Sequence, residues 1–240
     1  ITNIFTPSKS IQKWAEKKYA EEVKQGYLHI EYMGFTRFDL YAETRKDQKQ
    51  NSEMTVVLWT PRWTSENKGI MKSNFLNYYK QFFEFAKNHS EFKIIIRPHP
   101  LMFENYIKNG IMDKMEVEKI KAACKKMENI EIDERKDYFL SIQCADIFVS
   151  DFSSLLVEFF ATGKPVIYCD RSDEFAPECK EMDDCFIHVT SWNEIETALL
   201  HNKEKVMDVS AIDKNGILPL NMGNIGTDII NYLKKNHRKN

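Results

Sequence analysis

The feature that most constrains the fold is the regular alternation of short apolar runs with longer segments of helical periodicity. The runs that we predict as strands are residues 3–6, 28–33, 55–60, 93–97, 130–133, 146–150 and 165–169, with a weaker run at 186–189. Most of them are continuous stretches rich in Val, Ile and Phe, without alternating polar residues. This pattern is typical of strands that are covered on both faces, as in a parallel sheet.

The segments between these runs carry apolar residues at three- and four-residue spacing. One such stripe consists of Phe75, Tyr78, Tyr79, Phe82, Phe83 and Ala86. It predicts a helix that packs one face on the sheet. Ser191, with Glu194 three residues later, predicts an N-cap and capping box for a helix that runs to about Leu200. The alternation therefore predicts an α/β fold, a Rossmann-like parallel sheet with helices on both faces.

Length and charge exclude several classes of protein. The 240 residues suit one large domain, or one full domain plus a piece of another, and are enough for a buried core. Lys and Arg total 34 against 36 Asp and Glu, so the basic surplus typical of duplex-DNA binding is missing and we expect no nucleic-acid partner. No apolar run approaches the roughly 20 residues that a membrane helix needs. The five cysteines form no C-x-x-C pair and lack zinc-site spacing, so we expect reduced cysteines and no metal.

The segment Arg97-Pro98-His99-Pro100 at the end of one predicted strand is the first candidate for a site. Ligands of open α/β sheets bind beyond the carboxyl ends of the strands. The two prolines restrict the backbone on either side of His99, so that an imidazole and a guanidinium are presented together. Both groups bind phosphate, and histidine also acts as an acid or base. The alternative is a surface loop in which Arg97 forms an ordinary salt bridge.

A second candidate lies between the strand at 146–150 and a helix that is predicted to start near Leu155. Ser153 and Ser154 are placed at the start of this helix, where backbone N–H groups, the helix dipole and two hydroxyls suit a phosphate or pyrophosphate. The Gly-rich spacing of a P-loop or dinucleotide fingerprint is missing, so ATP and NAD are not favoured. Taken alone, the segment is more simply interpreted as N-capping by serine and Asp151.

A third candidate contains Thr60 and Arg62, and Glu158 is a weaker one. Thr60 and Arg62 follow the strand at 55–60, and Arg62 either faces the same crevice or lies in an exposed turn. Glu158, one helical turn after the serine pair, either accepts ribose hydroxyls or lies on the solvated surface of its helix. The sequence has no nucleophile elbow and no H-E-x-x-H motif, so serine hydrolase and zinc peptidase chemistry are not favoured. A paired D-x-D cluster of metal-dependent sugar transferases is missing as well.

Several segments, in this order, resemble the CDP-glycerol glycerophosphotransferase family of teichoic-acid polymerases and primases and related capsule polymerases. The resembling stretches are FTPSKSIQKWAEKKY, MGFTRFDLY, VVLWTPRW, IIIRPHP, ADIFVSDFSSLLVEFFATGKPVIY and MGNIGTDIINYL. The second contains Gly34, Arg37 and Asp39 in a pattern similar to the family's G-x-x-R-x-D. The resemblance implies a GT-B architecture, in which two Rossmann-like domains face each other across a cleft and this chain supplies the C-terminal half.

The resemblance also implies a division of the chain. Residues 1–42 would be the end of the N-terminal, acceptor domain with the interdomain segment, and 43–53 a polar linker. Residues 54–222 would form the C-terminal nucleotide-binding domain, and 223–240 a closing helix, at about 226–235, with a basic tail. The chain begins with Ile1 instead of Met, so we expect it to be part of a longer protein. The acceptor-side histidine base of the family would then precede Ile1.

The implied reaction transfers glycerol phosphate or ribitol phosphate from CDP-glycerol or CDP-ribitol to a hydroxyl of a polymer or lipid-linked acceptor, with release of CMP. His99 and Arg97 would be catalytic. The donor nucleotide and its phosphates would be bound by Ser153, Ser154, Asp151, Thr60, Arg62 and Glu158. No cofactor or metal is expected, because such a step needs positioning and charge stabilisation.

We expect the protein in the cytoplasm or peripheral on the cytoplasmic face of the bacterial membrane, and we consider membrane contact by the full-length protein.

Two other functions fit the same residues. One is a GT-B glycosyltransferase that uses a UDP-sugar or another sugar nucleotide for cell-surface polysaccharide and breaks the anomeric C–O bond. The other is a non-catalytic nucleotide-binding fragment. A preference for cytidine over uridine nucleotides distinguishes the first alternative from the leading function.

Overall fold

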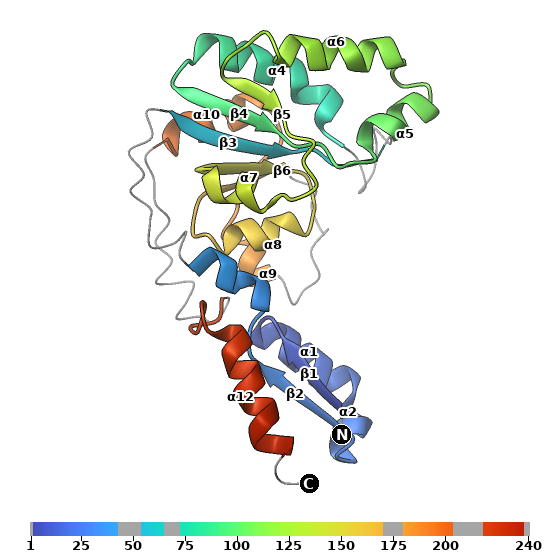
Figure 1. Ribbon diagram of the computed structural model, residues 1–240, viewed down its shortest axis with the longest axis vertical. Coiled ribbons are helices and arrows are strands. Elements are labelled where there is room, and N and C mark those ends of the chain that lie inside the picture. The colour runs from blue at the N-terminus through green and yellow to red at the C-terminus, as the bar shows by residue number, and fades with distance from the viewer. Residues whose placement is uncertain (1, 43–53, 65–72, 170–179, 204–217, 238–240) are drawn as a thin grey trace.

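The structure is a computed structural model that describes residues 2–42, 54–64, 73–169, 180–203 and 218–237. Figure 1 shows a larger α/β body at one end of the long axis and a smaller part, which holds both chain ends, at the other. The predicted linker at 43–53, one of the five cysteines (Cys179) and the last three residues of the basic tail lie outside the described residues. The division into domains remains a prediction.

The larger body is built on a six-stranded parallel sheet in the order β5-β4-β3-β6-β7-β8. Its strands are β3 (Thr55–Thr60), β4 (Phe92–Ile96), β5 (Ile130–Ile132), β6 (Ile147–Ser150), β7 (Val166–Cys169) and β8 (Ile187–Val189). Counted from β3, this is the 3-2-1-4-5-6 order of a Rossmann sheet. The predicted parallel sheet is confirmed, and each predicted strand agrees with the structure to within one residue at either end.

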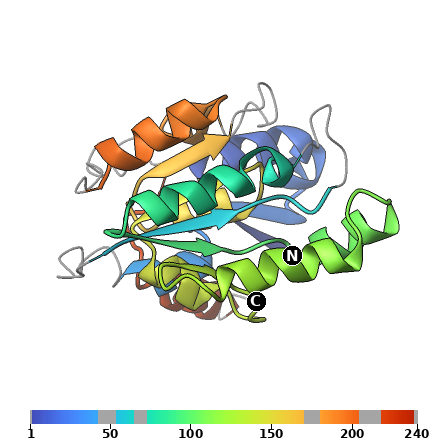
Figure 2. The ribbon, with the colours of Figure 1, turned by 90° about the horizontal axis from the view of Figure 1, so that it is seen from above.

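Helices cover both faces of this sheet, as predicted. One face packs against α4 (Phe75–Asn88), α5 (Met102–Lys108), α6 (Lys114–Cys124) and α10 (Trp192–His201). The other face packs against α7 (Phe139–Cys144), α8 (Leu155–Phe160), α9 (Lys180–Asp183) and the 3-10 helix η1 (Thr36–Tyr41). Figure 2 shows α4 and α10 side by side over their face of the sheet.

The core follows from the alternation of side chains along each strand. In β3, Val57 and Trp59 enter the cluster under α4, whereas Leu58 enters the cluster on the other face, and all three are fully buried. The Trp59 ring stacks on Phe75 and Phe82, with centroid distances of 5.6 and 4.2 Å. The aromatic stripe predicted for this helix therefore forms the contact between α4 and the centre of the sheet.

The smaller part contains a two-stranded parallel sheet and the last helix. Strands β1 (Thr2–Thr6) and β2 (Leu28–Tyr32) are joined through α1 (Lys9–Lys18) and α2 (Ala20–Lys24). The last helix, α12 (Ile225–His237), is present as predicted and contacts this sheet through Tyr232. The Tyr232 ring packs edge-on against Phe5, and its hydroxyl donates a 2.9 Å hydrogen bond to Glu31.

The predicted N-cap of α10 is confirmed, because Ser191 Oγ accepts the N–H of Glu194. The carboxylate of Glu194 binds the N–H of Thr190 at 2.6 Å, one residue before the position expected for a capping box. Among the described residues, no helix combines the length and the apolar character that crossing a membrane requires.

Candidate functional site

The candidate site lies where the strand order reverses, between β3 and β6. In open α/β sheets this switch point is where ligands bind. Strand β3 pairs with β4 on one side and with β6 on the other. The three segments selected from the sequence, residues 60–63, 97–100 and 150–155, follow these three adjacent strands. The fold therefore brings them together at the carboxyl edge of the sheet.

Hydrogen bonds connect the middle segment to both of its neighbours. The hydroxyls of Thr60 and Ser150 lie 2.7 Å apart, and both residues are buried. On the other side, the N–H of His99 donates to the carbonyl of Pro61 at 3.4 Å. The Thr60 hydroxyl, predicted to contact the donor, is thus engaged with Ser150 and helps to fix the relative position of the loops.

Asp151 supports the site from within the protein. Its side chain is buried, and Oδ2 accepts the N–H of Arg62 at 2.9 Å and the N–H of Asn74 at 3.0 Å. Oδ1 accepts the side-chain amide of Asn74 at 2.6 Å. Both oxygens have protein partners, and a carboxylate repels phosphate. The geometry therefore favours a scaffold role over the direct donor contact predicted from the sequence.

Arg62 and His99 lie in the adjoining loops. The Arg62 guanidinium lies 5.5 Å from the centroid of the Phe152 ring, a cation–π contact between the loops after β3 and β6. His99 is exposed, and its Nδ1 accepts the N–H of Leu101 at 3.2 Å. This bond places the proton of the neutral ring on Nε2. Although the residue as a whole is exposed, partial desolvation of its ring lowers the pKa of His99 below its usual value, which favours the neutral imidazole.

Arg97 forms a buried ion pair at the ends of β4 and β5. Its guanidinium donates to Asp133 and to the carbonyl of Arg135, each at 2.6 Å. Asp133 also accepts hydrogen bonds from the Arg135 side chain and from Ser141 Oγ. Burial raises the pKa of Asp133, but the hydrogen bonds from Arg135, Ser141 and Arg97 outweigh it and hold the pKa well below its usual range. This is the salt bridge that the sequence left open as the alternative for Arg97, and it anchors the loop that carries His99.

The serine pair begins α8 without capping it through a side chain. Ser154 is the N-cap residue, but its backbone is already helical and its side chain makes no capping hydrogen bond. Ser154 is exposed, and the hydroxyl of Ser153 lies 3.4 Å from that of Ser150. Capping by these hydroxyls, the simpler interpretation of the sequence, is therefore wrong. The Ser154 hydroxyl is available to a ligand.

Glu158 is a buried carboxylate with three protein partners. The hydroxyls of Tyr41 and Tyr138 each donate to it at 2.8 Å, and Nε of Arg37 lies 3.0 Å from Oε2. Burial and the hydrogen bond to Glu158 raise the pKa of Tyr138 to about 12. The predicted ribose contact would compete with these partners. The sequence did not indicate the two tyrosines, although Arg37 belongs to the G-x-x-R-x-D pattern.

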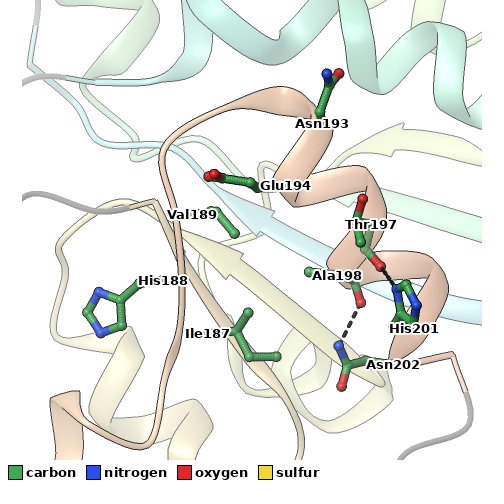
Figure 3. Close-up of a pocket in the computed structure, with 9 residues that line it drawn as sticks. All are labelled: Ile187, His188, Val189, Asn193, Glu194, Thr197, Ala198, His201 and Asn202. Carbon is green, nitrogen blue, oxygen red and sulfur yellow. Dashed lines mark hydrogen bonds between the residues drawn. The ribbon is translucent and has the colours of Figure 1, made fainter.

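A pocket of about 450 Å³ lies elsewhere, between the edge strand β8 and α10. Figure 3 shows that two of its polar side chains turn back to their own helix: Nδ1 of His201 lies 2.7 Å from the Thr197 carbonyl, and Asn202 donates to the Ala198 carbonyl at 2.7 Å. None of the candidate site residues predicted from the sequence lines this pocket. Within the described ranges, no group of three or more His, Cys, Asp or Glu side chains could hold a metal ion.

Solved structures share the fold of this chain. The wall teichoic acid polymerase TagF is 14% identical, with a TM-score of 0.61 over 98% of this chain and 58% of that chain. The UDP-GlcNAc 2-epimerase of Methanocaldococcus jannaschii, in complex with UDP-GlcNAc and UDP, is 17% identical, with a TM-score of 0.56 over 97% of this chain and 61% of that one. The chain spans about three fifths of the length of these proteins, and the likeness confirms a GT-B-like fold.

Sequence comparison gives the family. No curated protein matches the chain. The sequence model of the CDP-Glycerol:Poly(glycerophosphate) glycerophosphotransferase family matches residues 10–175, a span that includes all three loops of the candidate site. Because this match covers more than half of the sequence, the chain belongs to the CDP-glycerol:poly(glycerophosphate) glycerophosphotransferase family.

Proposed function

We propose that the chain is the donor-binding half of a transferase that moves a polyol phosphate from a CDP-activated donor to a hydroxyl of a teichoic-acid or capsule-type polymer. The observation that carries the proposal is the coincidence of family and fold. The family match spans the loops after β3, β4 and β6, and the strand pairing brings these loops to one switch point.

In the proposed reaction, an oxygen of the acceptor attacks the β-phosphorus of CDP-glycerol or CDP-ribitol. The bond between this phosphorus and the bridging oxygen breaks, CMP leaves with that oxygen, and the acceptor hydroxyl loses its proton to a base from the acceptor side. Such a step depends on orientation and on stabilising the charge of the phosphates. The proposed reaction includes neither a metal nor a cofactor. We therefore expect EDTA to leave turnover unchanged, which is the direct test of metal independence.

The residues divide into donor contacts and supports. The Nε2–H of His99, the hydroxyls of Ser153 and Ser154, and the Arg62 guanidinium supply hydrogen bonds and positive charge to the pyrophosphate. Since the lowered pKa of His99 favours the neutral ring, His99 acts first as a hydrogen-bond donor. The supporting residues are Arg97, Asp151, Thr60 and Glu158, whose side chains already have the protein partners described above.

We further propose a polymer or lipid-linked acceptor and a place of action in the cytoplasm or peripheral on the cytoplasmic face of the membrane. The support is the nucleotide-activated donor, a type of molecule that is made in the cytoplasm. The sugar-nucleotide alternative has an observation of its own in its favour. The epimerase of similar fold was solved in complex with UDP-GlcNAc and UDP.

Calorimetry with CDP, CMP, UDP and UDP-GlcNAc tests the proposal. We expect CDP to bind more tightly than UDP and UDP-GlcNAc, and His99→Gln to weaken the binding of CDP. His201→Gln is the matched control, because His201 lies at the edge pocket and turns to its own helix. Tighter binding of UDP would favour the sugar-nucleotide alternative, and a chain that binds none of the four would refute the proposed function.

A further inference from the structure

The short helix η1 carries two charged side chains that bind different helices. The first is Arg37, whose Nε lies 3.0 Å from the Glu158 carboxylate in α8. The second is Asp39, whose carboxylate accepts the backbone N–H groups of Gly223, Ile225 and Gly226 at the start of α12, at 2.7, 3.0 and 2.9 Å. Both residues belong to the G-x-x-R-x-D pattern, and the proposed reaction uses neither of them.

The contacts of Arg37 extend towards two loops of the candidate site, the one with the serine pair and the one with His99. Its guanidinium lies 4.8 Å from the centroid of the Tyr138 ring, and the guanidinium of Arg97 lies 6.0 Å from the same centroid. Tyr138 in turn donates to Glu158. The network therefore connects α8, which follows the serine pair, with Arg97, which precedes His99. A buried carboxylate such as Glu158 depends on partners of this kind.

Helix α8 depends on tertiary contacts because it is short. It has 6 residues, and an isolated helix of that length is unstable in water, so tertiary contacts determine where it lies. The side chain of Glu158 is its charged anchor. The residues immediately before α8 are Ser153 and Ser154. A displacement of Glu158 would therefore move the hydroxyls that the proposed function assigns to the donor phosphates.

The η1 segment is itself held firmly at its entry. Gly34 has a φ of +95°, which favours glycine, and its N–H donates to the carbonyl of Thr6 at the end of β1. A Cβ at Gly34 would lie 2.7 Å from Cγ of Pro219. The backbone before Arg37 is thus packed too closely for any other residue, which gives the arginine a fixed base from which to reach α8.

We propose that Arg37 is a positioning residue for donor binding: it holds α8 through Glu158 and thereby sets the position of Ser153 and Ser154. The identity of the ligand rests on the proposed function, whereas the effect on α8 does not. Asp39 provides a matched control. It lies on the same 3-10 helix and stabilises the same region, but it binds α12 instead of α8.

The first test is calorimetry of CDP with the full chain. Arg37→Ala is expected to weaken CDP about tenfold, equal to about 1.4 kcal/mol, and Arg37→Lys to recover part of the loss. Asp39→Ala is expected to lower the melting temperature but to leave the Kd for CDP within about twofold, because the coupling runs through α8. An unchanged Kd in Arg37→Ala, or an equal loss in Asp39→Ala, would overturn the proposal.

Tyr138→Phe separates positioning from direct contact with the donor. This variant keeps Arg37 but removes one hydrogen bond to Glu158, so a positioning network predicts a smaller loss of CDP affinity, about threefold. If Tyr138→Phe binds CDP normally while Arg37→Ala does not, Arg37 contacts the donor itself and the positioning role is refuted.

Hydrogen exchange without any ligand makes the test independent of the proposed function. Arg37→Ala is expected to speed the exchange of the amides in α8, and Asp39→Ala that of the first amides of α12. Unchanged exchange in α8 of Arg37→Ala would overturn the positioning role. A wild-type chain that binds no CDP, but whose α8 responds to Arg37→Ala, would refute the proposed function and leave the role of Arg37 in holding α8 supported.

Discussion

The carboxylate of Asp151 accepts the backbone N–H of Arg62 at 2.9 Å, which ties the loop after β6 to the loop after β3. The same carboxylate binds Asn74, immediately before α4. Residues before α4 and after β3 thus meet the distant Asp151 on one buried charge at the switch point. The arrangement of the donor-binding loops is expected to depend on Asp151, even though the residue has no need to touch the donor.

Replacing Asp151 with Ala should therefore affect stability and binding together. The variant leaves the N–H groups of Arg62 and Asn74 without their acceptor, and each buried unsatisfied group costs about 1–3 kcal/mol. We expect the free energy of unfolding in urea to fall by at least about 2 kcal/mol and CDP to bind more weakly. Asp113→Ala, which removes only the N-cap of the distant α6, should cost about 1 kcal/mol and leave CDP affinity unchanged. Normal stability in Asp151→Ala would contradict the scaffold role.

The pKa of His99 should respond to the donor. In the free protein, partial desolvation holds this pKa below its usual value, which favours the neutral ring. Bound phosphates favour the imidazolium, so CDP should raise the pKa and binding should take up a proton. CDP affinity is then expected to rise as the pH falls from 7.5 toward about 6. NMR titration of the His99 Cε1 proton with and without CDP measures the change, and the His201 signal is the control. A His99 pKa that does not move with CDP would argue against contact with the phosphates.

The sheet could be predicted from the sequence because its signal is local. Continuous apolar runs such as 93–97 mark strands covered on both faces, and strand–helix alternation permits few other topologies. The convergence of the loops that carry Thr60, His99 and Ser153 follows from the same information, since the carboxyl ends of adjacent parallel strands meet at one edge. The His99 loop and the serine pair are therefore found where the sequence placed them.

The partners of the charged residues could not be predicted, because they depend on long-range pairing. Tyr41 and Glu158 are 117 positions apart, and nothing in their local sequence indicates a shared hydrogen bond. Arg97 and Asp133 meet only because β4 and β5 end side by side. Glu158 and Asp151 are carboxylates close to the serine pair in sequence, which is why the sequence predicts a ligand contact for each. In the fold, both are buried and have protein partners, which the local sequence does not reveal.

Asp133→Asn should reduce stability and remove an acid-dependent part of it. The folded pKa of Asp133 lies well below the unfolded value of about 3.9, so its contribution is present above pH 4 and is lost as the pH falls toward the folded pKa. At pH 7, the variant leaves the guanidinium of Arg97, a side chain only 11% exposed, without its charge partner. Removing one member of a buried pair costs about 3–5 kcal/mol.

Urea unfolding of both proteins between pH 7 and pH 3 measures this effect. The wild-type free energy of unfolding should fall more steeply below pH 4 than that of Asp133→Asn. Glu131→Gln serves as the control, because its pair with Lys93 is exposed and should contribute at most about 1 kcal/mol. Parallel pH curves for the wild type and Asp133→Asn would show that Asp133 does not carry the acid dependence.

The double replacement of Ser153 and Ser154 with Ala tests the phosphate contact most directly. The Ser154 side chain makes no capping hydrogen bond, so the free energy of unfolding should change by no more than about 0.5 kcal/mol. Each hydrogen bond from a hydroxyl to a charged phosphate oxygen contributes about 1.5–3 kcal/mol, so CDP affinity should fall at least tenfold. Backbone N–H groups survive the change, so binding should weaken without disappearing. CMP lacks the second phosphate and should lose less. Dissociation constants for CMP and CDP, with a melting curve of the free variant, show whether the two hydroxyls contact the donor phosphates. Equal losses for the two nucleotides would exclude a β-phosphate contact, and a normal CDP affinity would remove the serine pair from the site.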